Sequence, residues 1–217
     1  MSQNDGHDPT KERLLDQAEA LFAQKGYDAV SVREITTAAR CNLAAVNYHF
    51  GSKENLYVEV FRARWAPRAM RVQESFRDSL AAQDEASPTT VARALAEAFL
   101  IGPLSDEERY RHHQLIVREL GQPTEAFKLV ADEVMRPFFR QLADMLRPTL
   151  PKGLDKEGLM LNILSMFAIV LHFNFARAAV TRMTGREYDE AFKARLVEHI
   201  TEFSLNGLGG HQQEVPR

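Results

Sequence analysis

The sequence predicts an all-α protein in which an N-terminal three-helix domain precedes a larger helical domain. Apolar residues recur every three or four positions through most of the 217 residues, as they do on one face of an amphipathic helix. The 11 glycines and 9 prolines stand mostly between these periodic segments. No long stretch alternates apolar and polar residues as a strand would, so helices are favoured throughout.

Three short helices are predicted within residues 10–57. Thr10 can cap the first of them, and Gly26 is placed to end it. Ser31 and Glu34 form the capping-box pattern that begins a second helix.

The second and third helices are joined by a turn at residues 40–42. Asn42 can cap the third helix, which is expected to end near Phe50. Two short helices joined in this way form a helix-turn-helix, whose second helix fits the major groove of DNA. The spacing alone fits a plain three-helix core as well, so the residue types must decide.

Longer helices are predicted for the rest of the chain, at residues 53–83, 88–101, 105–120, 124–147, 155–183 and 187–206. Pro67 and Pro137 lie inside two of them and predict kinks. The expected organisation is a disordered arm (1–9), a helix-turn-helix domain (10–57), a larger helical domain (58–206) and a flexible tail (207–217).

Composition excludes several classes of protein. A net charge of −3 provides no general attraction to phosphate, so any case for nucleic acid depends on local features. The single cysteine, Cys41, excludes an intramolecular disulfide and a cysteine-built metal site, and it is expected to be a buried core thiol. Residues 1–9 lack the pattern of a signal peptide, and a cytoplasmic location is expected.

The segment 159–180 is apolar over a length that could span a bilayer. Five polar residues interrupt it, namely Asn162, Ser165, His172, Asn174 and Arg177. Because polar groups are costly in lipid, a buried interface helix is favoured over a membrane span.

Three runs of residues resemble the TetR family of bacterial repressors. They are Lys25-Gly26-Tyr27, SVREI at 31–35, and NLAAVNYHFGSKENLY at 42–57. The Tyr-His-Phe at 48–50, followed three residues later by Lys53, is the hallmark of the resemblance, and the last run is similar to the subgroup related to CerR-type regulators. The resemblance implies a ligand-responsive regulator, most simply a repressor, that binds a pseudo-palindromic operator as a homodimer and is released by a small-molecule effector.

Two positions depart from the family's pattern. Arg40 stands in the turn where the family usually has glycine, and a positive φ would cost a non-glycine residue roughly 1 kcal/mol. Either the turn accommodates this cost or its geometry differs slightly. Asn47 replaces a frequent tyrosine, which exchanges a phosphate-directed group for an amide that can pair with adenine.

The residues expected to contact DNA are Thr10, Ser31, Arg33, Asn42, Leu43, Ala45, Asn47, Tyr48, His49 and Lys53. The segment 31–53 carries a charge of +2, and helix N-termini can add phosphate contacts. Tyr48 and His49 could instead only pack or be hydrated, and Asn47 is as well explained as a surface amide. Arg64, Arg68 and Arg71 form a basic stripe, which is interpreted as a solvated face.

In the larger domain the resemblance implies that the last two long helices pair with those of a second subunit. The residues predicted for this interface are Ile163, Val170, Phe173, Arg177 and Phe203. Those predicted to line an effector pocket are Phe99, His113, Val117, Met135, Phe138, Phe167 and His172.

The alternative hypothesis is a helical-bundle enzyme or metal-binding protein with no role on DNA. A di-iron bundle would require Glu-x-x-His pairs, but none of the seven histidines has an acidic residue three positions before it. His112 and His113 point about 100° apart on a helix and cannot chelate one ion together. No phosphate-binding loop or nucleophile elbow occurs, so no catalysis, metal or cofactor is expected. The expected partners are operator DNA, a second copy of the chain and an effector.

Overall fold

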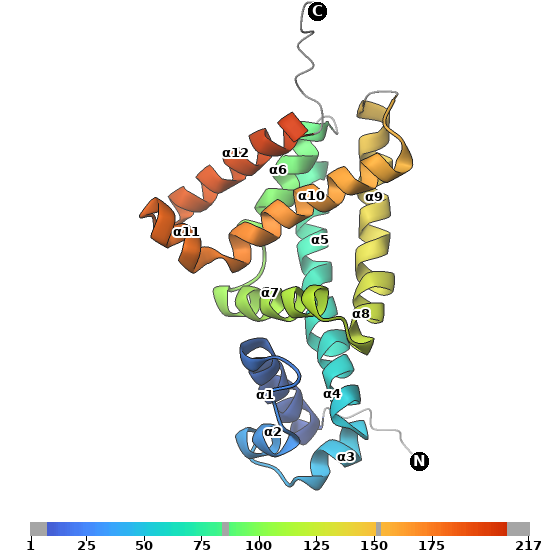
Figure 1. The fold of residues 1–217 in the computed structure, drawn as a ribbon, viewed down its shortest axis with the longest axis vertical. Coiled ribbons are helices and arrows are strands. Elements are labelled where there is room, and N and C mark those ends of the chain that lie inside the picture. The colour runs from blue at the N-terminus through green and yellow to red at the C-terminus, as the bar shows by residue number, and fades with distance from the viewer. Residues whose placement is uncertain (1–7, 84–86, 151–152, 208–217) are drawn as a thin grey trace, which may run out of the picture. The chain divides into compact units, whose positions relative to one another are not determined.

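The computed structural model describes residues 8–83, 87–150 and 153–207, and within these ranges the chain is helical with no β-strand. The all-α prediction is thus confirmed. The chain divides into two compact units, whose helices are labelled in Figure 1. The first unit combines Met1–Arg68 with Asp106–Val134, and the second combines Ala69–Ser105 with Met135–Arg217.

The first unit is built on the apolar faces of short helices. Its principal elements are α1 (Pro9–Lys25), α2 (Val32–Ala38), α3 (Ala44–Phe50), α4 (Lys53–Val60), α7 (Asp106–Gly121) and α8 (Glu125–Leu129). Helix α1 packs against α4 and α7, and α4 also packs against α8. Leu14, Phe22, Ile35, Val46 and Leu56 are fully buried and form the centre of this packing.

The start of α1 differs from the prediction. Asp8 caps the helix, since its Oδ1 accepts the N–H groups of Thr10 at 2.9 Å and Lys11 at 3.4 Å. Pro9 is the first helical residue, where its missing N–H is not needed. The prediction that Thr10 is the cap was therefore wrong, and of the arm predicted at 1–9 the first seven residues lie outside the described part.

Helices α2 and α3 begin close to the predicted positions. Ser31 Oγ accepts the N–H of Glu34 at 3.1 Å, but the Glu34 carboxylate accepts from Lys25 Nζ at 2.5 Å, so only half of the predicted capping box forms. The Asn42 amide oxygen accepts the N–H of Ala44 at 2.9 Å, as the predicted cap requires.

Both predicted proline kinks coincide with π-helical turns. The turn η1 (Phe61–Trp65) precedes α5 (Ala66–Ala81), which contains Pro67, and η2 (Val130–Met135) precedes α9 (Arg136–Leu146), which contains Pro137. A proline lacks an N–H and crowds the carbonyl four residues earlier. A wider turn just before it relieves both problems within a continuing helix.

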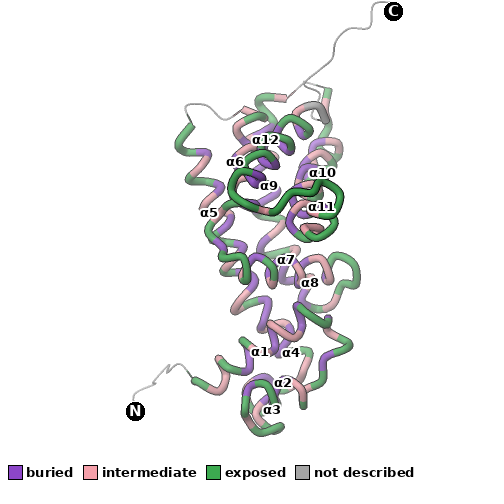
Figure 2. Tube along the Cα trace, turned by 90° about the vertical axis from the view of Figure 1, so that its left-hand side faces the viewer, coloured by how far each residue is buried: buried purple, intermediate pink, exposed green. Residues whose placement is uncertain are grey.

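The second unit packs its long helices around α6. Besides most of α5, it contains α6 (Pro88–Leu100), α9, η3 (Arg147–Thr149), α10 (Lys156–Phe175), α11 (Arg177–Thr184) and α12 (Glu190–Gly207). Helices α10 and α12 both pack on α6, and α9 packs on α10 and α6. Buried and exposed positions alternate along these helices, as Figure 2 shows for the tube of α12.

The helix predicted at 155–183 is interrupted at Ala176, whose φ and ψ are −88° and 22°. The Phe173 carbonyl accepts from the Tyr188 hydroxyl at 2.8 Å, in place of a main-chain N–H of a continuing helix. Helix α12 begins at Glu190 rather than at 187, because Asp189 accepts the N–H of Phe192 at 2.8 Å as a cap. Of the predicted tail, residues 208–217 lie outside the described part.

Helix α10 is long and apolar enough to cross a membrane by these two criteria alone. Its most apolar 18-residue window has a mean hydropathy of 1.7, and one third of that window is buried. Several of its exposed side chains are large and apolar, among them Leu161, Leu164 and Phe175.

Candidate nucleic-acid interface

Helix α3 presents one face to solvent and packs the other into the first unit. Val46 and Phe50 are buried, which turns Leu43, Asn47 and Tyr48 outward. The exposed fraction is 54% for Leu43 and 84% for Tyr48, so neither side chain is part of the core. Figure 2 includes this exposed stretch of α3. Three residues predicted to contact DNA therefore share one accessible face.

The same face differs in detail from the predicted set. Ala44, which the sequence reasoning missed, is exposed beside Asn47, whereas Ala45 is only half-exposed. The signal was available, since residues at i and i+3 lie on the same side of a helix. Small side chains here leave room for a base edge to approach the helix backbone.

The turn before α3 keeps its shape without glycine. Arg40 has a φ of +52°, so of the two possibilities that the sequence left open the turn adopts the left-handed one with arginine in place of glycine. The Arg13 guanidinium donates to the Ala39 carbonyl at 3.3 Å and so supports the end of α2 from α1. Cys41 is half-buried, and its Sγ lies 3.7 Å from the Thr36 carbonyl, so the prediction of a buried core thiol was wrong.

Three of the residues predicted to contact DNA are held by neighbours. The His49 side chain is only 10% exposed, and its Nδ1 lies 3.6 Å from Asp8 Oδ2. Lys53 Nζ sits 4.2 Å from the centroid of the Tyr27 ring, which positions the cation beside the start of α4. The Thr10 hydroxyl accepts from Arg13 at 3.2 Å.

Arg33 and Ser31 are exposed on α2 and at its cap. Tyr27, which supports Lys53, donates its hydroxyl to Glu54 at 2.8 Å. Burial and the Glu54 carboxylate raise the pKa of Tyr27 to about 12, so the phenol stays neutral.

Two residues of the basic stripe are paired with acids, so the interpretation as a solvated face was wrong for Arg64 and Arg68. Arg64 donates to Glu12 at 2.6 Å and to Asp16 at 2.9 Å, and its side chain is 19% exposed. Arg68 pairs with Glu19, a carboxylate that is 1% exposed. These ion pairs join the segment after α4 to α1. Arg71, in the second unit, donates to the Pro103 carbonyl at 2.7 Å.

The end of α7 is fastened to α1. Arg118 donates to the Ala23 carbonyl at 3.3 Å and to the Gln24 carbonyl at 2.9 Å. Carbonyls in the last turn of a helix have no partner within the helix, so Arg118 satisfies two of those at the end of α1. Gly26 ends that helix with a φ of +86°, and a Cβ there would meet the Arg118 guanidinium at 3.0 Å.

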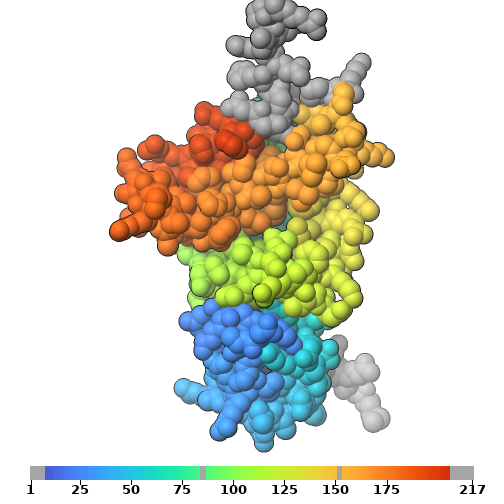
Figure 3. All heavy atoms as spheres, viewed as in Figure 1, coloured from blue at the N-terminus to red at the C-terminus, as the bar shows by residue number. Residues whose placement is uncertain are grey.

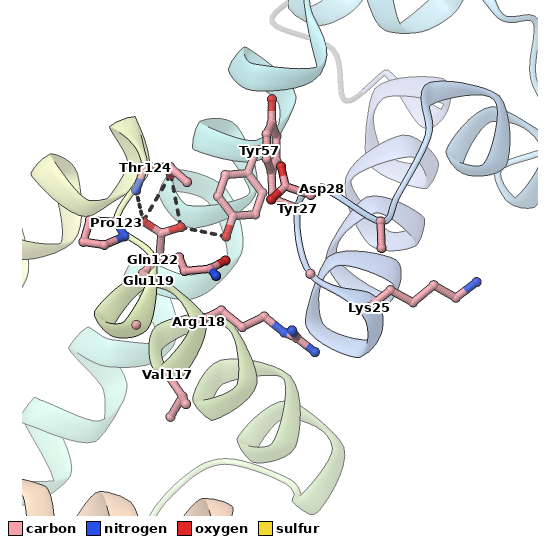
Figure 4. Close-up of a pocket in the computed structure, with 13 residues that line it drawn as sticks. Lys25, Tyr27, Asp28, Tyr57, Val117, Arg118, Glu119, Gln122, Pro123 and Thr124 are labelled. Atoms are coloured by element: carbon pink, nitrogen blue, oxygen red, sulfur yellow. Dashed lines mark hydrogen bonds between the residues drawn. The ribbon is translucent and has the colours of Figure 1, made fainter.

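An open pocket of about 740 Å³ lies in the first unit, bounded by the end of α1, by α4 and by the α7–α8 turn (Figure 4). At one end Tyr57 donates its hydroxyl to the buried carboxylate of Glu119 at 2.8 Å. Thr124 donates to the same carboxylate through its N–H at 3.0 Å and its hydroxyl at 3.1 Å. Burial and this carboxylate raise the pKa of Tyr57.

The residues predicted to line an effector pocket are distributed over both units. Phe99, Phe138 and Phe167 belong to one aromatic cluster of the second unit, with ring centroids 4.9 to 6.4 Å apart. Met135 packs against that core as a partly buried residue, and His172 is exposed on α10.

The other two residues of that set lie on α7 in the first unit. His113 is buried, and its Nδ1 lies 2.7 Å from the Arg109 carbonyl. Val117 lines the pocket of Figure 4.

Some residues predicted for a dimer interface are buried in the second unit, and others lie on its surface. Ile163 and Val170 are fully buried in the second unit's own core, so these two are corrected: their side chains do not reach its surface. Arg177 lies 5.0 Å from the Tyr188 ring centroid, and Phe173 is half-buried. Phe203, at 57% exposure, is on the surface. Among the described residues, no group of three or more His, Cys, Asp or Glu is placed to hold a metal ion.

A short helix with an exposed polar and apolar face, carried by a second short helix across a tight turn, defines a helix-turn-helix DNA-binding protein. Residues 14–60 match the model of the bacterial regulatory proteins of the tetR family. Residues 88–208 match the C-terminal domain of the HTH-type transcriptional dual regulator CecR. The chain belongs to the TetR family of transcriptional regulators, and the second match specifies its subgroup.

Individual relatives agree with this assignment. The chain is 27% identical over 195 residues to CecR of Shigella flexneri, covering 86% of this chain and 85% of the relative. It is 26% identical over 174 residues to the transcriptional repressor AcnR of Corynebacterium glutamicum, covering 73% and 92%. These relatives are regulators of transcription, not enzymes.

Solved structures support the fold. A TetR-like regulator from Rhodococcus sp. RHA1 aligns with a TM-score of 0.66 at 17% identity, covering 93% of this chain and 97% of that one. The fatty acid degradation regulator FadR from Bacillus halodurans aligns with a TM-score of 0.65 at 17% identity, covering 94% and 98%.

Proposed function

We propose that this DNA-binding regulator is a repressor that binds a pseudo-palindromic operator as a homodimer in the cytoplasm and is released by a small-molecule effector. The observation that carries the DNA part is the exposed face of α3, where Leu43, Asn47 and Tyr48 lie outward while Val46 and Phe50 anchor the helix. Two copies of this face, related by a two-fold axis, would read major grooves about one turn, or ~10 bp, apart.

Different residues are proposed to position the protein and to read sequence. Lys53, held over the Tyr27 ring, and the helix N-termini would contact phosphates. The Asn47 amide can form two hydrogen bonds to an adenine edge, and the Leu43 and Tyr48 side chains can contact thymine methyl groups. Specificity is then expected to concentrate at Asn47.

The test selects operators from a random DNA pool and compares Asn47→Ala with Lys53→Ala on the selected sites. Asn47→Ala should lose about 1–3 kcal/mol per half-site at one base position, which then tolerates substitution. Lys53→Ala should weaken all sequences alike and flatten the salt dependence by about one unit of slope per subunit.

Gln24→Ala, an exposed amide on α1, is the matched control and should bind like the wild type. Uniform weakening by Asn47→Ala at every base position would show that this residue only positions α3. Selection of no preferred sequence would contradict the proposed operator binding.

Two structural features support the homodimer and the effector response. Helices α10 and α12 leave large apolar side chains exposed, including Leu161, Leu164 and Phe203. The pocket of Figure 4 adjoins the Tyr57–Glu119 contact, so a molecule bound there could alter how α7 holds α4. A thermal-shift screen of small molecules, read out by operator binding, tests the response. A compound that stabilises the protein without changing operator affinity would not be an effector.

A further inference from the structure

Helix α10 carries a second apolar stripe that the second unit does not cover. Five exposed positions follow one another at spacings of three and four, which places them on one face of the helix. They are Leu161, Leu164, Ala168, His172 and Phe175. The opposite stripe, which includes Ile163 and Val170, fills the unit's own core. This double stripe explains why α10 is apolar enough to resemble a membrane span.

Two histidines stand among the apolar residues of this surface. Helices α10 and α12 border a groove of about 370 Å³, lined by Ala168, Ile169, His172, Phe173, His199 and Phe203. The rings of His172 and His199 both meet the Phe173 ring edge to face, with centroids 5.5 and 5.8 Å apart. In Figure 3 the orange α10 and the red α12 form one continuous stretch of the second unit's surface.

A second copy of the chain fits this surface better than a charged partner would. A two-fold axis sets the same patch against itself, so the patch must complement itself. Charges of one sign would repel across the axis, but α10 has no Asp, Glu, Lys or Arg between Glu157 and Arg177. An uncharged apolar stripe meets this requirement. The inference below rests on the proposed homodimer.

We propose that dimerisation is linked to protons through His172 and His199, which stay neutral under a second copy and take up protons when it leaves. A solvated imidazole titrates near pH ~6.5, and a charged one is costly to bury among apolar side chains. Acid should therefore favour the separated chains, because only there can both rings be charged and hydrated.

Few charges surround these rings. On α12, Arg195 and Glu202 lie one turn to either side of His199, with opposite signs, and Glu198 is held by Arg93 at 2.5 Å. At the start of α11, Arg177 is held over the Tyr188 ring. By symmetry a second copy would add the same set. No carboxylate on α10 itself lies within four turns before His172, so α10 offers the imidazolium no partner of its own.

The size of the effect follows from the number of rings covered. Each imidazole that cannot be protonated in the dimer weakens association about 10-fold between pH ~8 and pH ~5.5. The two copies of His172 alone give about 100-fold, and all four rings about 10⁴-fold. These are upper values, reached when every ring is fully covered.

Sedimentation velocity of the full chain at about pH 8 and pH 5.5 tests the proposal, with circular dichroism at each pH to verify that the protein stays folded. The wild type should be a dimer at the higher pH, and its association should weaken by about 100-fold at the lower one, the value for two fully covered copies of His172. The double variant His172→Phe/His199→Phe continues the stripe with rings that do not titrate, so its dimer should be insensitive to this change. The single variant His172→Phe should lose part of the response.

Three results would overturn the proposal. A wild-type dimer of equal affinity at both pH values would contradict the proton linkage but leave the homodimer intact. Equal weakening of the wild type and the double variant in acid would assign the response to other groups. A monomer at pH ~8 would overturn both the linkage and the homodimer, and flotation of that monomer with phosphatidylglycerol vesicles would identify lipid as what covers the stripe.

Discussion

His112 illustrates what single buried residues do in the first unit. It is 3% exposed, and its ring stacks on Trp65 with centroids 4.7 Å apart and planes 5° from parallel. Trp65 Nε1 donates to the His112 carbonyl at 3.1 Å. Burial, reinforced by the neighbouring His113, holds the pKa of His112 well below its usual range. The ring is therefore a neutral packing element in the folded protein.

This arrangement predicts a loss of stability in mild acid. Below pH ~6.5 the unfolded chain protonates His112 and the folded protein does not, so stability that is present above this pH is lost as the pH falls. The slope for this group is at most about 1.4 kcal/mol per pH unit. Urea unfolding at about pH 7.5 and 5.5 should show a smaller loss for His112→Phe, whose ring can still stack on Trp65. Equal losses in both proteins would contradict the prediction.

Single residues also mark the limits of sequence reasoning. The positive φ of Arg40 was one of two outcomes that the sequence left open, because the rest of the turn decides whether a non-glycine residue is held in the left-handed region. The exposure of Tyr48 followed from the buried neighbours of α3. The pairing of Arg68 with Glu19 was not predictable, since its partner is 49 residues away and only the tertiary contact makes an apparent surface stripe into a buried ion pair.

At the scale of elements, α7 holds the two helices that flank the DNA-reading pair. Arg118 donates a hydrogen bond to a carbonyl at the end of α1, and Glu119 accepts one from Tyr57 on α4. These adjacent side chains come from one turn of α7 and reach two different helices. A shift of that turn would therefore change the contacts of both α1 and α4.

Tyr57→Phe tests how strongly α7 holds α4. It removes one of the donors to the buried Glu119 carboxylate, and we expect about 1–3 kcal/mol less stability in urea unfolding. Tyr27→Phe is the matched control, since it removes an exposed hydroxyl bond to Glu54 and should cost less than about 1 kcal/mol. Similar losses of unfolding free energy in the two variants would show that the buried contact with Glu119 stabilises the protein no more than the exposed contact with Glu54 does.

Elements were predicted best where local chemistry decides their ends. Gly26 terminates α1 with a positive φ, as predicted, and Gly185 ends α11 in the same way. The break at Ala176 was missed because nothing local marks it. It depends on the Tyr188 hydroxyl, which approaches the Phe173 carbonyl only after the chain has folded back.

At the scale of the whole molecule, the exposed stripe of α10 is the surface that the proposed homodimer would bury. Leu164→Glu places a charge on that stripe and should convert the dimer to a monomer in light scattering at micromolar concentration. Leu120→Glu changes a leucine of similar exposure on α7, 45% against 42%, and should leave the dimer intact. A dimer retained by both variants, or lost by both, would contradict this assignment of the surface.

The all-α class and the family were within reach of the sequence, because periodicity and the 42–57 run are local. The effector-pocket residues were chosen as aromatic and histidine side chains on apolar helices. Phe99, Phe138 and Phe167 proved to be packed ring against ring. Composition cannot separate a ring that lines a cavity from one that fills a core, because both need the same apolar helix face.

The first unit is discontinuous in sequence, and this restricts how the protein can be recombined. The chain leaves the unit after Arg68 and returns to it at Asp106. A chimaera that joins residues 1–68 to a foreign regulatory domain would leave behind Arg118, Glu119 and His112, and would expose Trp65 and the end of α1. Transferring the first unit to another regulatory domain therefore requires two segments of the chain, 1–68 and 106–134, and a junction at each place where the chain leaves or re-enters the unit.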